Sequence, residues 1–432
     1  MISQQPQWLQ RALDYRDPRV VAIFILSLAS GLPFLLTLAT LHVWLSEVGV
    51  NKTTIGVFVL TTLPYTLKFL WAPLLDHARF PILEPLLGRR KAWMVASQLC
   101  LMFCLVRLGL SDPAHHLEET AFWAFMVALS SATQDTAIEA YRIELFQMSQ
   151  MRLGASASVV GYRMGMWISG AGALYLASSI SWPLVYILMA ACISLGIVAV
   201  LLAPEAQAAS LASVSEAGKT LKARIQTSFL SLISQPGVWF ALPLILFYKA
   251  GDTLLNAMTA PFLLDIGFSK IEIAHVAKSF GIAAMIFGGL SAGSFLRDRA
   301  LNSMIRICFL LQLASCLLYA AQAEVGHHLG LLFFALGFEN FATGFASAVF
   351  ITYLSGLCSK PHTATHFALL ASFASFSRVM FSTATGWLAD HVSWSMFYGL
   401  GAALAFLGWV VTQNLFQNSL QISQHPPLPQ RP

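Results

Sequence analysis

Apolar segments of about twenty residues recur along the chain, and short polar connections separate them. An α-helix needs about 20 consecutive apolar residues to cross the hydrocarbon core of a bilayer. The pattern therefore predicts an all-α, polytopic membrane protein. It places twelve membrane-spanning helices at residues 20–45, 55–75, 92–110, 120–141, 155–179, 184–203, 238–263, 275–296, 303–322, 329–353, 366–388 and 394–415.

A polar stretch in the middle of the chain divides these helices into two sets of six. It contains no apolar run long enough to cross a bilayer, so we interpret it as a cytoplasmic linker. The tail is rich in proline and polar residues, which favours disorder. The expected parts are a cytoplasmic N-terminal segment 1–19, a six-helix bundle 20–204, the linker 205–237, a second six-helix bundle 238–415 and a disordered cytoplasmic tail 416–432.

An internal repeat relates the two halves. The stretch 45–55 runs parallel to the stretch 263–273, and Arg163 and Arg378 stand in equivalent positions ahead of a tryptophan. The matched residues are Glu47, Gly49, Lys52 and Ile55 in the first half and Asp265, Gly267, Lys270 and Ile273 in the second. Two six-helix pseudo-repeats joined by a cytoplasmic linker are the organisation of a major facilitator transporter, whose substrate path runs between the halves.

Composition and charge agree with a membrane protein. The chain is 57% hydrophobic and only 10% charged, whereas charged residues make up about 25% of soluble proteins. The apolar run after residue 19 is long enough to stay in the membrane, which argues against a cleaved signal peptide. Most Lys and Arg residues fall in alternate connections, and the positive-inside rule then places both termini in the cytoplasm. The six cysteines lie in apolar spans or an inner connection, which excludes an extracytoplasmic disulfide framework.

The fourth predicted helix ends in an unusual group of charges. Asp135, Glu139 and Arg142 are spaced i,i+4 and i,i+3, so all three project from one helix face. A charge near the bilayer centre costs roughly 2.5 to 3.5 kcal/mol, so each needs a partner, a proton or a water-filled path. Arg142 can offset one of the two carboxylates, and the other is a candidate for loading and releasing a proton.

Other predicted helices also carry interior charges. Lys249 and Asp252 are spaced i,i+3 in the seventh helix, where a static ion pair is the alternative to a functional role. Glu339 in the tenth helix has no nearby cation in sequence, so it must pair across helices or hold a proton, and a satisfied structural carboxylate remains possible. The hypothesis is that Asp135, Glu139, Asp252 and Glu339 include the proton-loading groups. The residues expected to bind substrate or pair with these charges are Lys68, Gln134, Arg142, Arg163, Tyr248, Lys249, Asn340, His366 and Arg378.

Charged connections on the cytoplasmic side are candidate gates. The connection after the second helix contains Asp76 and then Arg89 and Arg90, and its counterpart in the second half contains Asp298 and Arg299. Such residues can close one side of a transporter through reversible ion pairs. The alternative is that they only orient the chain by positive charge.

Several motifs together resemble the muropeptide permease (AmpG-like) family of major facilitators and, more distantly, the acetyl-coenzyme A transporters. The resemblance extends from about Asp17 to Leu415. Its specific stretches are Gly31–Pro33, Leu63–Pro73, Ser131–Asp135, Glu139–Arg142, Tyr248–Asp252, Phe338–Asn340 and Thr363–Leu370. The chain departs from the family pattern at His366, where Gln is expected, and at Glu139, where Asp is common.

The resemblance implies a proton-coupled importer of cell-wall-derived anhydro-muropeptides in the inner membrane of a Gram-negative bacterium. We then expect a monomer in the lipid bilayer, with protons and a small glycopeptide as ligands and with no nucleic acid, cofactor or metal. Alternatives are a paralogue that carries another peptide, an amino sugar or a nucleotide-linked anion such as acetyl-coenzyme A, and a receptor that binds muropeptides without transporting them. An intramembrane aspartyl protease is disfavoured, because Lys249 stands where its Gly-x-Gly-Asp motif needs glycine.

Overall fold

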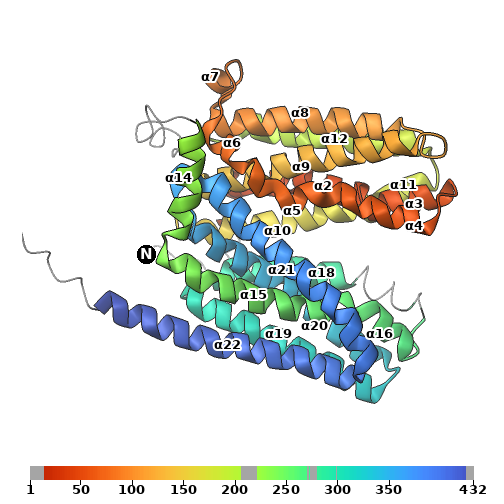
Figure 1. The fold of residues 1–432 in the computed structure, drawn as a ribbon, viewed down its shortest axis with the longest axis vertical. Coiled ribbons are helices and arrows are strands. Elements are labelled where there is room, and N and C mark those ends of the chain that lie inside the picture. The colour runs from red at the N-terminus through yellow and green to blue at the C-terminus, as the bar shows by residue number, and fades with distance from the viewer. Residues whose placement is uncertain (1–13, 206–220, 270–271, 273–279, 298, 425–432) are drawn as a thin grey trace, which may run out of the picture. The chain divides into compact units, whose positions relative to one another are not determined.

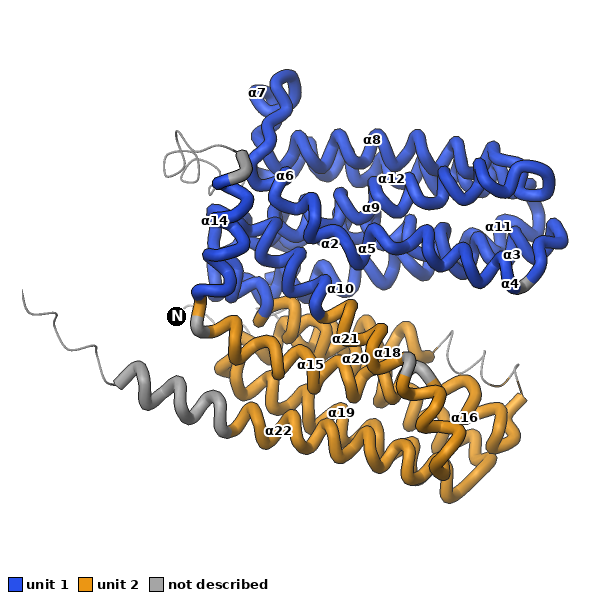
Figure 2. The backbone as a smooth tube through the Cα atoms, in the orientation of Figure 1, with its two compact units in different colours: residues 1–234, 354–373 blue, residues 235–353, 374–432 orange. Residues whose placement is uncertain are grey.

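In a computed structural model of the chain, the described residues are 14–205, 221–269, 272, 280–297 and 299–424. Every regular element in this part of the chain is a helix (Figure 1). The chain divides into two compact units, shown in different colours in Figure 2. Unit 1 comprises Met1–Ser234 and Leu354–Phe373, and unit 2 comprises Gln235–Tyr353 and Ala374–Pro432.

Unit 1 is built from long helices joined by short helical turns. Its elements are α2 (Pro18–Leu36), α3 (Ala39–Glu47), α4 (Lys52–Val57), η1 (Phe58–Thr62), α5 (Leu63–Leu67), η2 (Lys68–Leu70), α6 (Ala72–His77), α7 (Glu84–Leu87), α8 (Arg89–Gly109), α9 (Leu117–Leu145), α10 (Met151–Trp167), the π-helical turn η3 (Ile168–Gly172), α11 (Ala173–Ala177), α12 (Trp182–Leu202) and α14 (Leu221–Ile233). The turn η5 (Lys360–His362) and the start of α21 (Thr363–His391) also belong to this unit.

Unit 2 contains α15 (Pro236–Ala257), α16 (Thr259–Asp265), α18 (Ile282–Phe295), α19 (Leu301–Val325), most of α20 (Leu329–Gly356), the rest of α21 and α22 (Trp394–Gln424). Helix α22 continues beyond residue 415, so the tail expected from residue 416 begins as helix, and residues 425–432 lie outside the described part.

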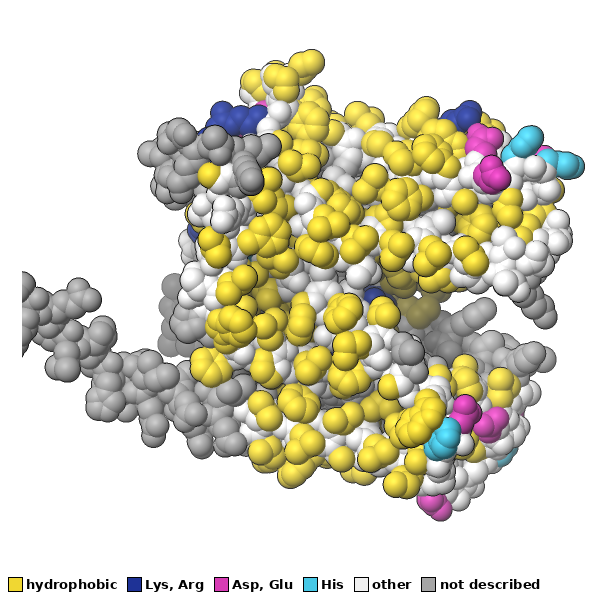
Figure 3. All heavy atoms as spheres, in the orientation of Figure 1, with side chains coloured by type: hydrophobic (Ala, Val, Ile, Leu, Met, Phe, Trp, Pro, Cys, Tyr) yellow, Lys and Arg dark blue, Asp and Glu magenta, His cyan; other side chains and the backbone are white. Residues whose placement is uncertain are grey.

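All twelve segments predicted from hydropathy overlap described helices, and the all-α class is confirmed. Within the described residues, nine helical runs are long and apolar enough to cross a membrane. Helix α9, which carries the group of charges described above, is not among them. On the face drawn in Figure 3, hydrophobic side chains cover the middle lengths of the helices in each unit, and acidic and histidine side chains gather at helix ends.

Prolines break the predicted second helix into shorter pieces. Instead of one helix over 55–75, the structure has α4, η1, α5, η2 and α6 in succession. Pro64 and Pro73 stand in the first turns of α5 and α6. Because proline lacks a backbone N–H and clashes with the preceding turn, it is favoured in the first turn of a helix and disturbs the hydrogen bonds of a helix interior. Lys68 therefore lies in a short 3₁₀ turn.

The internal repeat is confirmed by equivalent contacts in the two units. The indole of Trp182 donates to Glu47 Oε2 at 2.7 Å, and the indole of Trp394 donates to Asp265 Oδ2 at 3.2 Å. Gly49 and Gly267 both have positive φ, 85° and 97°, which side chains rarely adopt. Glu47 and Gly49 thus lie in a turn that matches the turn of Asp265 and Gly267, whereas Lys270 and Ile273 lie outside the described residues.

Glycine allows α2 and α10 to pack backbone to backbone. A Cβ added at Gly161 would lie 2.3 Å from the Phe24 carbonyl oxygen, and one at Gly165 would lie 2.2 Å from the Leu28 carbonyl oxygen. Neither obstacle is a flexible side chain, so α2 itself would have to shift. Small residues at such interfaces are typical of membrane helix packing.

Gly161→Ala is expected to lower the thermal stability of the purified protein, since overpacking costs about 1 to 3 kcal/mol. Gly399→Ala in α22 is the matched control because a Cβ there meets nothing within 4 Å. Without a clash, alanine favours a helix by up to about 1 kcal/mol over glycine. Thermal unfolding in detergent, monitored by tryptophan fluorescence, compares the stability of the two variants. Equal stability for both would contradict the close packing.

Candidate functional site

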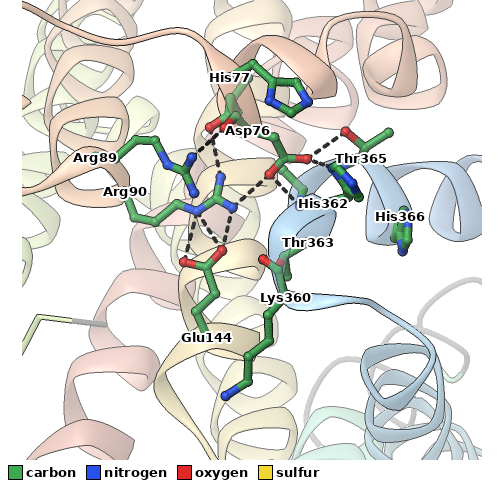
Figure 4. A network of polar contacts seen from close by, with 12 residues as sticks. Asp76, His77, Arg89, Arg90, Glu144, Lys360, His362, Thr363, Thr365 and His366 are labelled. Carbon is green, nitrogen blue, oxygen red and sulfur yellow. Dashed lines mark hydrogen bonds and ion pairs between the residues drawn. The ribbon is translucent and has the colours of Figure 1, made fainter. Parts of the chain in front are cut away.

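Arg90 is the centre of a buried network of charges in unit 1 (Figure 4). Its Nη2 lies 2.7 Å from Asp76 Oδ1, and its Nε donates to the two oxygens of Glu144 at 3.0 and 3.1 Å. Its Nη1 donates to the Leu75 carbonyl at 2.9 Å. The three charged side chains are at most 5% exposed. One guanidinium thus holds α6 and α9 to the start of α8.

Asp76 also binds the N-terminus of α21. Its carboxylate accepts hydrogen bonds from the backbone N–H groups of Ala364 and Thr365, at 3.2 and 2.9 Å, and from the Thr365 hydroxyl at 2.6 Å. The first N–H groups of a helix have no partner within the helix, and the helix dipole favours an anion there. Asp76 therefore caps the N-terminus of α21 from α6.

The surroundings of Asp76 favour its charged form. Burial raises the pKa of this carboxyl, but the charge of Arg90 and the hydrogen bonds from Thr365 and Arg90 outweigh it and hold the pKa below its usual value. The carboxylates of Asp76 and Glu144 face the guanidiniums of Arg90 and Arg89, and the N-terminus of α21 also favours a negative charge on Asp76. Asp76 consequently stays ionised at neutral pH.

His366 joins α21 to the linker helix α14. Its Nδ1 accepts from the Ser359 backbone N–H at 3.2 Å, and its Nε2 donates to the Ser228 carbonyl at 3.1 Å. Because a backbone N–H can only donate and a carbonyl can only accept, the ring is neutral with its proton on Nε2. Nε2 also lies 2.9 Å from Ser231 Oγ, and the side chain is fully buried. The structure thus places His366 against α14.

His366→Gln, which restores the residue of the family pattern, is expected to keep most of the stability, because an amide can accept from Ser359 and donate to Ser228. His366→Leu leaves both groups without this partner and is expected to cost about 1 to 3 kcal/mol. Thermal unfolding of the two variants beside the parent checks this. If leucine were tolerated as well as glutamine, the hydrogen bonds would not be what holds α14.

Arg142 and Glu139 form the ion pair that their spacing predicts. Arg142 Nε donates to Glu139 Oε2 at 3.0 Å, and Nη2 donates to Ser355 Oγ at 3.1 Å. The guanidinium also lies over the ring of Phe367, 5.6 Å from its centroid. The arginine is fully buried, and the side chain of Glu139 is 18% exposed. Arg142 therefore holds the end of α20 and the start of α21 to α9 within unit 1.

Asp135 lies one turn deeper on α9 and has different partners. Its carboxylate accepts from the Ser30 hydroxyl of α2 and is attracted by the charge of Lys68. Gln134 beside it is fully buried, and neither atom of its amide has a hydrogen-bond partner in the described part of the chain. The predicted group of three charges is thus divided, with Glu139 paired to Arg142 and Asp135 facing Lys68.

In unit 2 the second predicted ion pair is present. Lys249 Nζ lies 3.3 Å from Asp252 Oδ2, and Asn256 donates to Asp252 Oδ1 at 3.3 Å. Glu339 on α20 accepts from Asn340 at 3.0 Å and from Thr343 at 3.2 Å. A pocket within this unit is lined by both Asp252 and Glu339.

The remaining candidates are more dispersed. Tyr248 is buried and its ring stacks on Phe350, with centroids 3.8 Å apart. Arg163 is half-buried with its Nη1 3.7 Å from the Met166 sulfur, whereas Arg378 and Arg299 are exposed. Arg89 donates to the Asp76 carbonyl. Asp298 lies outside the described residues.

Sequence reasoning missed three participants. Glu144, the second carboxylate on Arg90, follows Arg142 by two residues and belongs to the same run of charges. Thr365 lies in the stretch Thr363–Leu370 that was noted for its resemblance alone. Gln312, with a buried amide that lines the pocket of unit 2, stands in an apolar segment where no pattern marks it.

Comparisons with known proteins agree with this architecture. Residues 20–113 match the family model described as acetyl-coenzyme A transporter 1. The anhydromuropeptide permease of Escherichia coli (strain K12) is 34% identical over 399 residues, covering 92% of this chain and 79% of that protein.

Solved structures resemble the fold at low sequence identity. The proton:xylose symporter XylE matches with a TM-score of 0.66 at 11% identity, over 92% of this chain and 95% of its own. The major facilitator FucP matches with a TM-score of 0.66 at 13% identity, over 92% and 99%. Both establish the major facilitator fold.

Proposed function

Because the chain belongs to the anhydromuropeptide permease (AmpG) family of major facilitators, and is thus a membrane transporter and not an enzyme, we propose that it imports anhydro-muropeptides. The cargo is a GlcNAc-anhydro-MurNAc peptide released by cell-wall turnover, and the driving force is the proton gradient. The observation that carries this proposal is the 34% identity to a named anhydromuropeptide permease over 92% of the chain.

The protein is a multi-pass membrane protein. We place it in the bacterial inner membrane with both termini in the cytoplasm, as a monomer that supplies the cell with fragments for peptidoglycan recycling. The bacterial relative supports this location, and the excess of Lys and Arg in alternate connections supports the orientation.

The proton-coupling groups are the interior carboxylates Asp135, Glu139, Asp252 and Glu339. Glu139 and Asp252 are each paired with a cation on the same helix, so protonation of the carboxylate would weaken the ion pair. If one conformation of the protein binds the proton more tightly than another, protonation shifts the population towards that conformation. Asp135 differs because its cation, Lys68, lies on another element.

The cargo carries carboxylates on its muramyl and peptide parts, and the interior cations are suited to attract them. Those assigned to this role are Lys68, Arg142, Arg163, Lys249 and Arg378. The polar side chains assigned to contacts with the sugar and peptide are Gln134, Tyr248, Asn340 and His366. The unpartnered amide of Gln134 supports its assignment, since a buried amide without partners has both a donor and an acceptor to offer.

The network around Arg90 acts as a latch in the transport cycle. Asp76, which Arg89 and Arg90 contact, binds the start of α21 through hydrogen bonds. Such hydrogen bonds can be exchanged for hydrogen bonds with water. The contacts of Asp76 with Thr365 and Arg90 support this role. Asp298 and Arg299 are the corresponding residues of the second half.

Uptake of radiolabelled anhydro-muropeptide into proteoliposomes, with and without an inward proton gradient, tests the proposal. Gradient-dependent accumulation supports it. The second candidate cargo is acetyl-coenzyme A, which the family match over residues 20–113 favours, so unlabelled acetyl-coenzyme A is added as a competitor. Binding of muropeptide without accumulation would instead identify a receptor.

A further inference from the structure

The 78–88 loop, which connects α6 to α8 and contains α7, is apolar where a connection in water is normally polar. From Phe80 to Leu87 its only charged residue is Glu84. Ile82 and Leu86 are each 78% exposed. Exposed apolar side chains that lie close together mark a surface that binds something. The tip of this loop is therefore a candidate interaction surface.

The base of the 78–88 loop is attached to α8. The Trp93 indole donates to the Ala78 carbonyl at 3.3 Å, and the ring of Phe80 packs edge-on against the ring of Trp93, with centroids 4.6 Å apart. Backbone hydrogen bonds within α7 order the tip. The apolar side chains thus belong to an ordered segment with a defined direction.

The loop projects sideways from the end of α8. In Figures 1 and 2, α7 lies beyond the side of α8, at the end where α8 begins. Figure 3 shows hydrophobic side chains on this projection. Membrane-spanning helices lie within about 40° of the bilayer normal. A segment that leaves a helix end sideways therefore runs along the bilayer surface, whereas a segment that continued the helix axis would enter the water.

The face of α8 below the loop is exposed in the membrane-spanning part. Trp93, Cys100 and Phe103 are spaced i, i+7 and i+10, which places them within one helix face. Cys100 is exposed, and Phe103 is 58% exposed. Because apolar side chains exposed on a membrane-spanning helix face lipid, the 78–88 loop lies at the lipid-facing side of α8.

The charge of this segment selects the kind of surface. Glu84 is the only acidic residue from Ala78 to Lys91, and the basic residues in that stretch are Arg79, Arg89, Arg90 and Lys91. The side chain of Arg79 is 68% exposed. Basic residues beside a membrane are attracted to anionic lipid headgroups, and tryptophan is enriched at the same depth. Apolar tip, basic flanks and a tryptophan at the base together favour a lipid surface over a soluble protein.

We propose that the 78–88 loop is an interfacial anchor, with Ile82 and Leu86 immersed among the lipids of the adjoining leaflet and Arg79 at anionic headgroups. This leaflet is the cytoplasmic one in the orientation proposed above. The anchor fixes the end of α6 and the start of α8, which carry Asp76 and Arg90. The proposal does not depend on the identity of the cargo or on proton coupling.

Spin labels on the full-length protein in proteoliposomes measure the immersion of the loop. Labels are attached at Ile82→Cys and Leu86→Cys, and their relaxation is compared between oxygen, which concentrates in lipid, and a water-soluble nickel chelate. Phe103→Cys is the lipid reference, and Ala114→Cys, at an exposed position of another connection, is the water reference. The parent protein, treated with the same label, gives the signal of the native cysteines, which is subtracted.

Both labels are expected about 5 to 10 Å below the headgroup boundary, with a larger response to oxygen than to nickel, as at Phe103→Cys. A larger response to nickel, as at Ala114→Cys, would place the loop in water and overturn the proposal. A weak response to both reagents would overturn it as well, because another part of the chain or a second copy would then cover the loop. Either label alone decides the test if the other variant fails to fold.

Arg79→Gln tests the class of lipid. In vesicles of phosphatidylcholine with phosphatidylglycerol, the label at Leu86→Cys is expected to lie deeper than in phosphatidylcholine alone, and Arg79→Gln should remove this difference. Arg107→Gln is the matched control and should leave the difference intact, because Arg107 is also well exposed but lies in the last turn of α8. The same depth in both kinds of vesicle would overturn the contact of Arg79 with anionic headgroups.

Discussion

Asp76→Ala is expected to raise amide exchange at Ala364 and Thr365 by at least about tenfold and to slow uptake strongly. Hydrogen bonds to a charged group contribute about 1.5 to 3 kcal/mol each, and the carboxylate accepts from two backbone groups and one hydroxyl of α21. Since about 1.4 kcal/mol corresponds to tenfold, one lost bond is enough for that change. Arg90 keeps Glu144 as partner, so no unpaired charge is left in the core.

Hydrogen exchange, detected by mass spectrometry of the peptide around residues 359–370, measures how far the N-terminus of α21 is released from Asp76. Asp112→Ala is the matched control, because Asp112 also accepts a backbone N–H, from Ala114 at 3.1 Å, but on an exposed loop. Thr365→Val removes one of the three bonds and is expected to give a smaller increase. Unchanged exchange in Asp76→Ala would show that Asp76 does not hold α21.

This contact is not expected to respond to pH near neutrality. The pKa of Asp76 is lower in the folded protein than in the unfolded chain, so its contribution to stability is present above the ordinary aspartate pKa of about 3.9. It is lost as the pH falls through the lowered pKa. Any pH dependence of transport between pH 5 and about 8 must therefore come from other groups.

Asp135→Asn is expected to abolish accumulation driven by the proton gradient while leaving exchange of cargo across the membrane. Asparagine preserves the shape of the side chain and the contact with Ser30, but it cannot take up a proton. Accumulation should fall to the level seen without a gradient, and counterflow of labelled against unlabelled cargo should persist. The two measurements together separate coupling from binding.

Glu119→Gln is the matched control for this substitution. Glu119 lies on the same helix and also faces a cation, with Arg107 Nη2 at 3.0 Å, but both side chains of this pair are well exposed. Surface ion pairs of this kind are worth about 0 to 1 kcal/mol. Accumulation in Asp135→Asn equal to that of the parent would remove Asp135 from the coupling groups.

The sequence was sufficient for most of the helices and for contacts within one helix, but not for the division of 55–75 into short elements. Hydropathy located the membrane-spanning segments, and helical spacing predicted the pairs Arg142–Glu139 and Lys249–Asp252, both of which are present. Those pairs follow from a period of 3.6 residues, which does not depend on the rest of the fold. The repeat was equally visible because it rests on matched residues such as Glu47 and Asp265.

Contacts between distant segments could not be predicted in this way. Asp76 and Thr365 are 289 residues apart, and only the folded chain brings the carboxylate to the helix terminus. The position of His366 in the sequence does not reveal that its ring contacts Ser228 and Ser231 of α14, and its proposed contact with the substrate is still a prediction. Gln312 carries no sequence signal, since a single amide in an apolar helix becomes informative only when its partner is known.

Proton-coupled import requires cargo and protons to enter together, and the pH outside weakly buffered proteoliposomes measures this directly. Addition of unlabelled anhydro-muropeptide to vesicles without an imposed gradient should make the external medium more alkaline, as protons enter with the cargo. The response should be absent in Asp135→Asn and present in Glu119→Gln. Uptake of cargo with no change in external pH would contradict proton coupling.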